Sequence, residues 1–466
     1  MTEQLHQRLA DLAGDVASPG PADPAVLWRA GKRRQRRRTA AAGLAACAVL
    51  AGIGATGLAL PGTGLVTTPV PAVQGDTLRV PDRLHVPSAW LPTTAEEGPI
   101  GPLALVITGG VERDLVGGET AYVGVSAVTG QYRFLSLPGL STTGGAWGDT
   151  IALSADGRKL AYWYGGGGHS ADEFAIEADG IAVYDTVTGD VVRRAIDSPH
   201  GIGGERPAWV GDKVWVSWFE RVEGDPSSGV NGRTMSWDPE TDRMERLPGG
   251  VVLPGEMATT TGSRAVLSGR SGVTILDARG RTERTVKVAR GWEGELLLSP
   301  GGTMLAGRHD PDGDPSSYSN EPAPVLVGPA SEAEAARLQS GAVCKVCPAV
   351  RLDQVPRSTG LTPVAWRDEE HLVVTRVADR NTDHERWEYV VLDVETGAVD
   401  EFIEPARATG SGNHLFAADA WTWPTWDAPA PDAPLNPRVV LGVGLVIVLA
   451  SGLGSLLLWR RSRVVR

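Results

Sequence analysis

The stretch Ile151-Ala-Leu-Ser-Ala-Asp-Gly-Arg-Lys-Leu-Ala-Tyr-Trp-Tyr164 predicts two short antiparallel strands joined by a tight turn at Asp156-Gly157. After a loop, Ile181-Ala-Val-Tyr-Asp-Thr-Val-Thr-Gly-Asp-Val-Val-Arg-Arg-Ala-Ile196 repeats the pattern, with its turn at Thr188-Gly189. Apolar residues alternate within both halves, as expected for strands with one or two buried faces. Together the halves predict a unit of four antiparallel strands with tight first and third turns and a long middle loop.

This unit recurs along the chain. Six copies of roughly 40–50 residues begin near Leu103 and continue through the segments 151–196, 208–243, 264–280, 296–306 and 364–397. Two flanking strands, Thr77–Val86 and Asn413–Ala420, are expected to complete one shared closing blade. The period and the four strands per unit predict an all-β, six- or seven-bladed β-propeller.

One motif carries a family resemblance. Leu153-Ser-Ala-Asp-Gly-Arg-Lys-Leu-Ala-Tyr162 resembles the Leu-Ser-Pro-Asp-Gly-x-x-Leu-Ala signature of WD-repeat-like and TolB-like propellers, and Leu298-Ser-Pro-Gly-Gly-Thr-Met-Leu-Ala306 is a degraded copy. The Gly-His and Trp-Asp pairs of WD repeats do not recur from unit to unit, since each occurs once within residues 77–420, at Gly168-His169 and Trp237-Asp238. The resemblance covers residues 77–420 and implies the fold. It implies no single activity, because such propellers bind, scaffold and catalyse.

Two charge-free apolar runs, Thr39–Leu60 and Val439–Trp459, bracket the repeats, and each has arginines on its outer side. Each run is long enough to cross a bilayer core of about 30 Å as a helix. Because basic clusters stay cytoplasmic, we predict two single transmembrane helices in the plasma membrane, both termini cytoplasmic and the repeat domain extracytoplasmic. A cleaved signal peptide is the alternative for the first run, although its 22 residues exceed a signal core of about 7–15.

The predicted organisation has seven parts: a cytoplasmic basic segment (1–38), a transmembrane helix (39–60), a linker (61–76), the propeller (77–420), a Pro/Trp-rich stalk (421–438), a second transmembrane helix (439–459) and a cytoplasmic basic tail (460–466). Residues 39–437 contain 31 basic and 52 acidic residues, a net charge near −21. Such a surface disfavours nucleic acid as a partner. The five lysines against thirty-nine arginines resemble an actinobacterial composition.

The middle loops are the candidate binding site. They are polar in four units, at 165–173, 220–233, 309–322 and 379–386, and equivalent loops of a propeller emerge on one face. Loop drift without function is the alternative. The candidate binding residues on this face are His169, Asp172, Glu173, Asp225, His309, Asp310, Asp312, Asp314 and His384.

Two further patterns suggest ligands or cross-links. The acids of His309-Asp-Pro-Asp-Gly-Asp-Pro315 are spaced as calcium ligands can be, but Gly313 and Pro315 depart from the helix-loop-helix calcium pattern. We expect no metal site and no cofactor, with calcium as an open alternative. Cys344 and Cys347 are expected to form a disulfide, because zinc would need two more nearby ligands and a redox motif would need a thioredoxin-like context.

Catalytic motifs are missing. The chain has no Gly-x-Ser-x-Gly elbow, phosphate loop or His-Glu-x-x-His. We therefore predict a membrane-tethered extracytoplasmic propeller that binds or scaffolds at the cell envelope, with an envelope protein or a cell-wall ligand as its partner. The alternative hypothesis is a propeller enzyme, a hydrolase or lyase with its site at the channel mouth.

Overall fold

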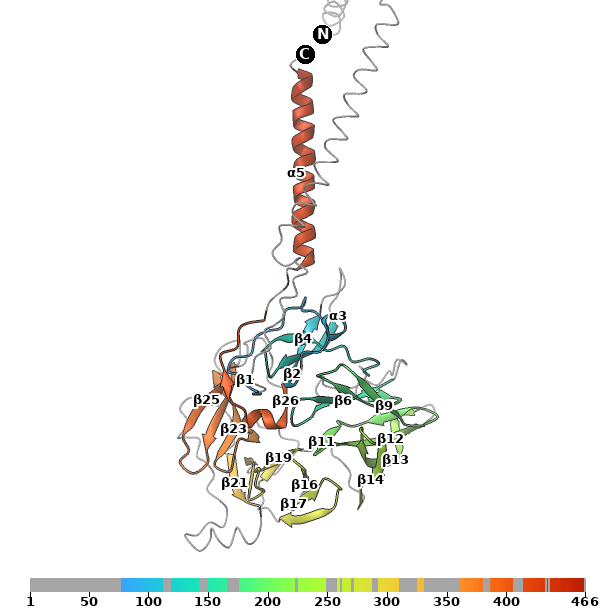
Figure 1. Cartoon of the computed structure of the whole chain (residues 1–466), viewed down its shortest axis with the longest axis vertical. Coiled ribbons are helices and arrows are strands. Elements are labelled where there is room, and N and C mark those ends of the chain that lie inside the picture. Colours follow the sequence, from blue (N-terminus) through green and yellow to red (C-terminus); the bar gives the residue numbers. More distant parts are fainter. Residues whose placement is uncertain are drawn as a thin grey trace, which may run out of the picture. The chain divides into compact units, whose positions relative to one another are not determined.

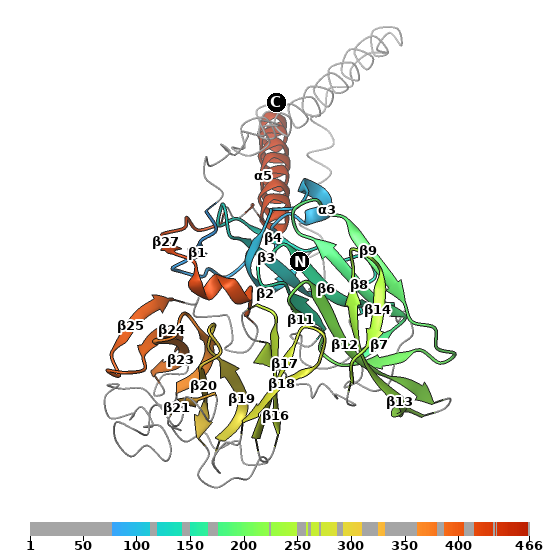
Figure 2. The same ribbon diagram turned by 60° about the horizontal axis from the view of Figure 1, so that its bottom comes forward.

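The computed structural model describes residues 77–111, 119–141, 150–165, 176–222, 225–248, 258–259, 262–269, 272–286, 292–309, 325–330, 361–379, 386–404, 414–431, 434 and 436–464. The chain divides into two compact units, residues 71–434 and a second unit made of residues 1–70 and 435–466. The first unit is an all-β, six-bladed propeller, whose blades follow one another around a ring in Figures 1 and 2.

Each blade is one antiparallel sheet. From the centre outward, the first blade contains β26 (Leu415–Phe416), β2 (Leu103–Val111), β3 (Glu119–Ser126) and β4 (Tyr132–Phe134), and the second β5 (Ile151–Leu153), β6 (Lys159–Tyr164), β8 (Gly180–Asp185) and β9 (Val191–Ala195). The third contains β11 (Ala208–Val210), β12 (Lys213–Val222), β13 (Asp225–Asp238) and β14 (Arg243–Arg246). The fourth contains β15 (Ala258–Thr259), β16 (Arg264–Gly269), β17 (Gly272–Asp277) and β18 (Thr282–Val286).

The last two blades follow the same order. The fifth contains β19 (Trp292–Leu298), β20 (Met304–His309) and β21 (Val325–Pro329) among the described residues, and the sixth β22 (Leu361–Trp366), β23 (His371–Asp379), β24 (Arg386–Asp393) and β25 (Val399–Ile403). The first strands of neighbouring blades contact one another from β26 through β5, β11, β15 and β19 to β22. These strands therefore line the propeller axis.

The repeat motif folds as the sequence predicts. Ser154 Oγ donates to Asp156 Oδ1 at 2.7 Å, the amide of Arg158 donates to the same oxygen at 3.1 Å, and Gly157 has φ 71°. The Asp156 carboxylate thus accepts hydrogen bonds from both sides of the turn. Gly157 supplies the left-handed backbone conformation that the turn needs. Gly189, in the second predicted turn of this blade, has φ 83°.

The degraded copy in the fifth blade lacks the aspartate, and the next blade supplies a carboxylate instead. Ser299 Oγ donates to Glu369 Oε2 at 2.7 Å, and the Gly301 amide and the Thr303 hydroxyl also donate to Glu369. Glu369 lies in the turn between β22 and β23. In the second blade the carboxylate comes from the turn itself, whereas in the fifth blade it comes from the neighbouring blade. The bond therefore joins two blades.

The ring closes at the first blade, but only partly as predicted. The strand expected within Asn413–Ala420 exists as β26, which pairs with β2 at Leu105↔Phe416. The expected strand Thr77–Val86 is wrong as a blade strand: β1 (Val80–Pro81) pairs in parallel with β27 (Thr425–Trp426), and beyond it Arg83 forms one isolated parallel bridge with Glu404, which follows β25. Pro81 has no amide hydrogen, which disfavours this segment as an inner strand of a blade. The propeller therefore has six blades rather than seven.

Buried tryptophans pack the blades, as predicted. Trp163, Trp215, Trp218 and Trp366 are all buried, and two indoles on first strands also join neighbouring blades. Trp209 Nε1 donates to Ala152 O at 3.0 Å, and Trp366 Nε1 donates to Leu297 O at 3.1 Å. In both pairs the acceptor lies on the first strand of the preceding blade.

Besides the strands, the described residues form two short helices and one long C-terminal helix. α3 (Thr94–Glu97) begins with a capping box formed by Thr93 and Glu96, and η3 (Ala418–Thr422) places Trp421, which the sequence assigns to the stalk, in the core. α5 (Pro437–Val464) belongs to the second unit. Within the described ranges, no helix combines the length and hydropathy required to cross a membrane, and the predicted first span, 39–60, lies outside them.

Candidate binding face

The two edges of the propeller differ in how the strands are joined. Because each blade is antiparallel, the first and third turns lie at one edge, here called the turn edge. The connections between second and third strands, and those between blades, lie at the opposite edge, here called the middle-connection edge. At the turn edge the described turns are tight, with glycines of positive φ at Gly157, Gly189 and Gly397. The predicted binding residues belong to the middle-connection edge.

Most of those predicted residues fall outside the described residues. They are His169, Asp172 and Glu173 between β6 and β8, Asp310, Asp312 and Asp314 between β20 and β21, and His384 between β23 and β24; Cys344 and Cys347 also fall outside. His309 is the last residue of β20 and faces Trp292 in the register, and Asp225 is the first residue of β13 and faces Val222. Their roles in binding and in the disulfide stay predictions.

The segment predicted as a long loop at 220–233 is instead a hairpin, so that prediction is wrong. β12 and β13 continue past the blade, with Glu220 paired with Val230 and Arg221 with Gly229. On the other side of β12, β10 (Ile202–Gly204) pairs with it and with β7 (Ile176–Ala178). The polar side chains suggested a loop, but the backbone groups of this segment form strand hydrogen bonds with one another. The sheet that contains β7, β10, β12 and β13 links the second and third blades.

Two ion pairs strengthen this edge. Arg233 contacts Glu220 at 3.0 Å, and Arg376 contacts Glu388 at 2.7 Å with both side chains less than one-fifth exposed. In the second pair the residues are direct cross-strand neighbours of β23 and β24. Opposite charges at facing positions stabilise a strand pair. Spacing alone would not have paired them, because Arg376 lies three residues before Asp379 and Glu388 two residues after Arg386, with a register shift between the two pairs.

A half-buried histidine, His414, lies directly before the strand that closes the ring. Tyr389 Oη and His414 Nδ1 are 2.8 Å apart, and Phe416 and Trp421 pack against the Tyr389 ring with centroid separations of 5.3 and 5.7 Å. His414 Nε2 is buried and has no hydrogen-bond partner among the described residues. Burial lowers the pKa of His414 to about 4 and raises that of Tyr389. The pair is therefore neutral at pH 7.

We expect acid to destabilise the propeller through His414. In the unfolded chain histidine takes a proton near pH 6.5, whereas in the fold it does so only near pH 4. As the pH falls from 7 towards 4, the unfolded state binds more protons and stability is lost. The loss at pH 5 is about 2 kcal/mol. Urea unfolding of the full chain, followed by tryptophan fluorescence at pH 7 and pH 5, measures it.

The control for this prediction is a second histidine. His414→Gln should lose less stability between pH 7 and pH 5 than the wild type does, because no imidazole remains to be protonated. His200 is exposed, so His200→Gln should keep the full wild-type loss. Equal losses in His414→Gln and the wild type would show that other groups cause the acid sensitivity.

The described residues form no candidate metal site. No group of three or more His, Cys, Asp or Glu side chains suited to a metal ion occurs within the described parts of the chain. The acids proposed as calcium ligands lie outside those parts. Calcium therefore stays an untested alternative.

Comparison with known proteins gives structural neighbours but no family. No protein-family model matches the chain, and no curated protein matches it. Solved structures that resemble it include the β-propeller domain of the Trilobed protease from Pyrococcus furiosus, at 14% identity over 66% of this chain and 82% of that chain, with a TM-score of 0.39. TolB from Acinetobacter baumannii is 13% identical over 64% of this chain and 69% of that chain, with a TM-score of 0.30. A TolB protein, whose family the repeat motif resembles, and a protease propeller are thus among the structures to which this chain is similar.

Proposed function

We propose that this chain is a membrane-tethered, extracytoplasmic propeller that binds an envelope protein or a cell-wall ligand through its middle-connection edge. The proposal has two parts. The membrane holds the propeller by both of its ends, and the middle-connection edge, which carries the longer connections, binds the partner. Binding rather than catalysis follows from the missing catalytic motifs and from the polar middle connections.

The observation that carries the proposal is the parallel pairing of β1 with β27. The Val80 amide donates to Pro424 O and the Asp82 amide to Trp426 O, both at 3.0 Å. The Arg79 amide donates at 2.9 Å to Ala127 O, in the third turn of the first blade. The chain therefore enters and leaves the propeller side by side at the turn edge. This arrangement suits two tethers in one membrane, because both points of attachment lie at the turn edge of the propeller.

The C-terminal tether is supported by the surface of α5. Seven of its aliphatic side chains are 43–64% exposed: Val439, Val443, Val446, Ile447, Val448, Leu449 and Leu453. A helix that is apolar all round is normally covered by protein or by lipid. The run Val439–Trp459 contains no charge and is followed by Arg460 and Arg461. We propose that this run and residues 39–60 span the plasma membrane with both termini in the cytoplasm.

Fusions after Arg466 test the tether. Alkaline phosphatase folds into an active enzyme only outside the cytoplasm, whereas green fluorescent protein exported in unfolded form does not fluoresce there. We expect a fluorescent green fluorescent protein fusion and an inactive phosphatase fusion. An active phosphatase at this end would contradict the two-span topology.

Photo-crosslinking in the native membrane tests the binding face. A photoreactive residue at Val222, exposed on the β12–β13 hairpin, should crosslink to a defined envelope protein or cell-wall fragment identifiable by mass spectrometry. The matched control is Glu395, exposed in the turn between β24 and β25 at the turn edge. The same product from both positions, or none from Val222, would contradict the proposed face.

A further inference from the structure

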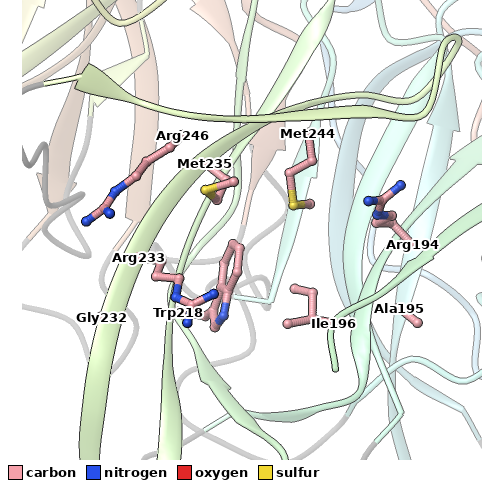
Figure 3. Close-up of a pocket in the computed structure, with 9 residues that line it drawn as sticks. All are labelled: Arg194, Ala195, Ile196, Trp218, Gly232, Arg233, Met235, Met244 and Arg246. Carbon is pink, nitrogen blue, oxygen red and sulfur yellow. The ribbon is translucent and has the colours of Figure 1, made fainter. Parts of the chain in front are cut away.

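A pocket of about 490 Å³ opens between the second and third blades (Figure 3). One wall is the outer strand β9 with the residue after it, and the other is the face of β12, β13 and β14. Its volume lies within the range of roughly 300–1,000 Å³ typical of small-molecule sites. The pocket is lined by Arg194, Ala195, Ile196, Trp218, Gly232, Arg233, Met235, Met244 and Arg246.

The base of the pocket is apolar because of the strand register. Met235 faces Val216 on β12, and Met244 faces Trp237, which lies two residues beyond Met235 on the same side of β13. Ile196, Met235 and Met244 are partly buried and pack on the core shared by the second and third blades. Methionine side chains are flexible and polarizable, so they can adapt to an aliphatic ligand.

Three arginines surround this apolar surface, as Figure 3 shows. Arg194 is paired with Asp242 at 2.8 Å and Arg233 with Glu220 at 3.0 Å. Arg246 is exposed, and within the described residues no carboxylate forms an ion pair with it. Among the described residues, the rim therefore carries one positive charge without a carboxylate partner beside an apolar surface. That combination matches a ligand with a single negative charge and an aliphatic body.

We propose that this pocket binds a small aliphatic carboxylate, with the carboxylate on the Arg246 guanidinium and the chain over Met235 and Met244. Guanidinium and carboxylate groups match in bidentate geometry, which favours a carboxylate head. The proposal goes beyond the proposed function, because it requires neither the membrane tether nor a macromolecular partner.

Equilibrium dialysis tests the proposal with radiolabelled octanoate and the full chain in lipid nanodiscs, the signal of empty nanodiscs being subtracted. We expect saturable binding of octanoate and at least tenfold weaker binding of 1-octanol, which has the same chain without the charge. Arg246→Gln should raise the dissociation constant for octanoate at least tenfold. Arg243→Gln, on the same strand but outside the pocket lining, should leave it unchanged.

Three results would contradict the proposed carboxylate site. Absence of saturable octanoate binding, equal binding of octanol and octanoate, or an unchanged dissociation constant in Arg246→Gln would each overturn the proposal. Circular dichroism of both variants establishes that they are folded, which the exposure of Arg246 and Arg243 leads us to expect.

Discussion

Gly157→Ala is expected to lower the free energy of unfolding of the propeller by about 3 kcal/mol, from backbone strain and steric overlap together. Gly157 has φ 71°, a conformation that costs an L-residue about 1–2 kcal/mol. A Cβ at this position would also meet the Leu103 carbonyl oxygen at 2.0 Å. That contact involves backbone, so it can be relieved only if the first and second blades move apart.

The movement would break a further bond, because the Leu103 amide of the first blade donates to Gly157 O of the second blade at 2.9 Å. Thermal or urea unfolding of the full chain measures the loss. Gly189→Ala is the matched control, since Gly189 has φ 83° but its nearest neighbour, Pro99 Cδ, would lie 3.7 Å from the new Cβ. It should cost only the backbone strain of about 1–2 kcal/mol. Equal losses in the two variants would show that steric contact between the blades contributes nothing.

Trp366→Ala is expected to lower the free energy of unfolding by about 3–5 kcal/mol, the usual cost of removing a large buried aromatic side chain. Trp366 is 2% exposed and packs in the core of the fifth and sixth blades with Leu297, Leu372 and Val374. The alanine variant loses this packing and also leaves Leu297 O without the indole donor, which is 3.1 Å away in the wild type. Urea unfolding followed by far-ultraviolet circular dichroism measures the change without depending on the removed fluorophore.

Trp366→Phe separates packing from hydrogen bonding. Phenylalanine keeps most of the apolar surface, so its cost should be about 1–3 kcal/mol, mainly from the unsatisfied carbonyl. Trp209→Phe removes the equivalent bond to Ala152 O and should cost a similar amount. Full stability in both phenylalanine variants would contradict a role for these indoles in joining the blades.

Local features of the fold could be predicted from the sequence. The turn at Asp156-Gly157 and the alternation of the flanking strands depend on residues close together in the chain, and both were found. The repeats predicted six or seven blades, and the structure has six. The tryptophans within strands were correctly assigned to the core for the same reason, since alternation fixes which side chains turn inward.

The binding face could be predicted less well. Polarity suggested a loop at 220–233, yet the segment pairs with itself and with β10, because a hairpin that extends beyond its blade can expose polar side chains. No pattern predicted the pocket around Arg246. Its walls come from β9 and from β12 to β14, and only the packing of two blades brings Arg194 and Met244 to one cavity.

The sequence by itself determined the repeat unit and its tight turns and predicted six or seven blades, because these follow from contacts between residues near one another in the chain. Only the tertiary structure decided which distant groups meet. Glu369 replaces the missing aspartate of the fifth blade from 70 residues away, and β1 pairs with β27 across nearly the whole domain. Such contacts form only once the ring has closed and the blades are in register. The turn beside Ser299 and the strand at Val80 therefore acquire their partners from the fold, not from their own sequence.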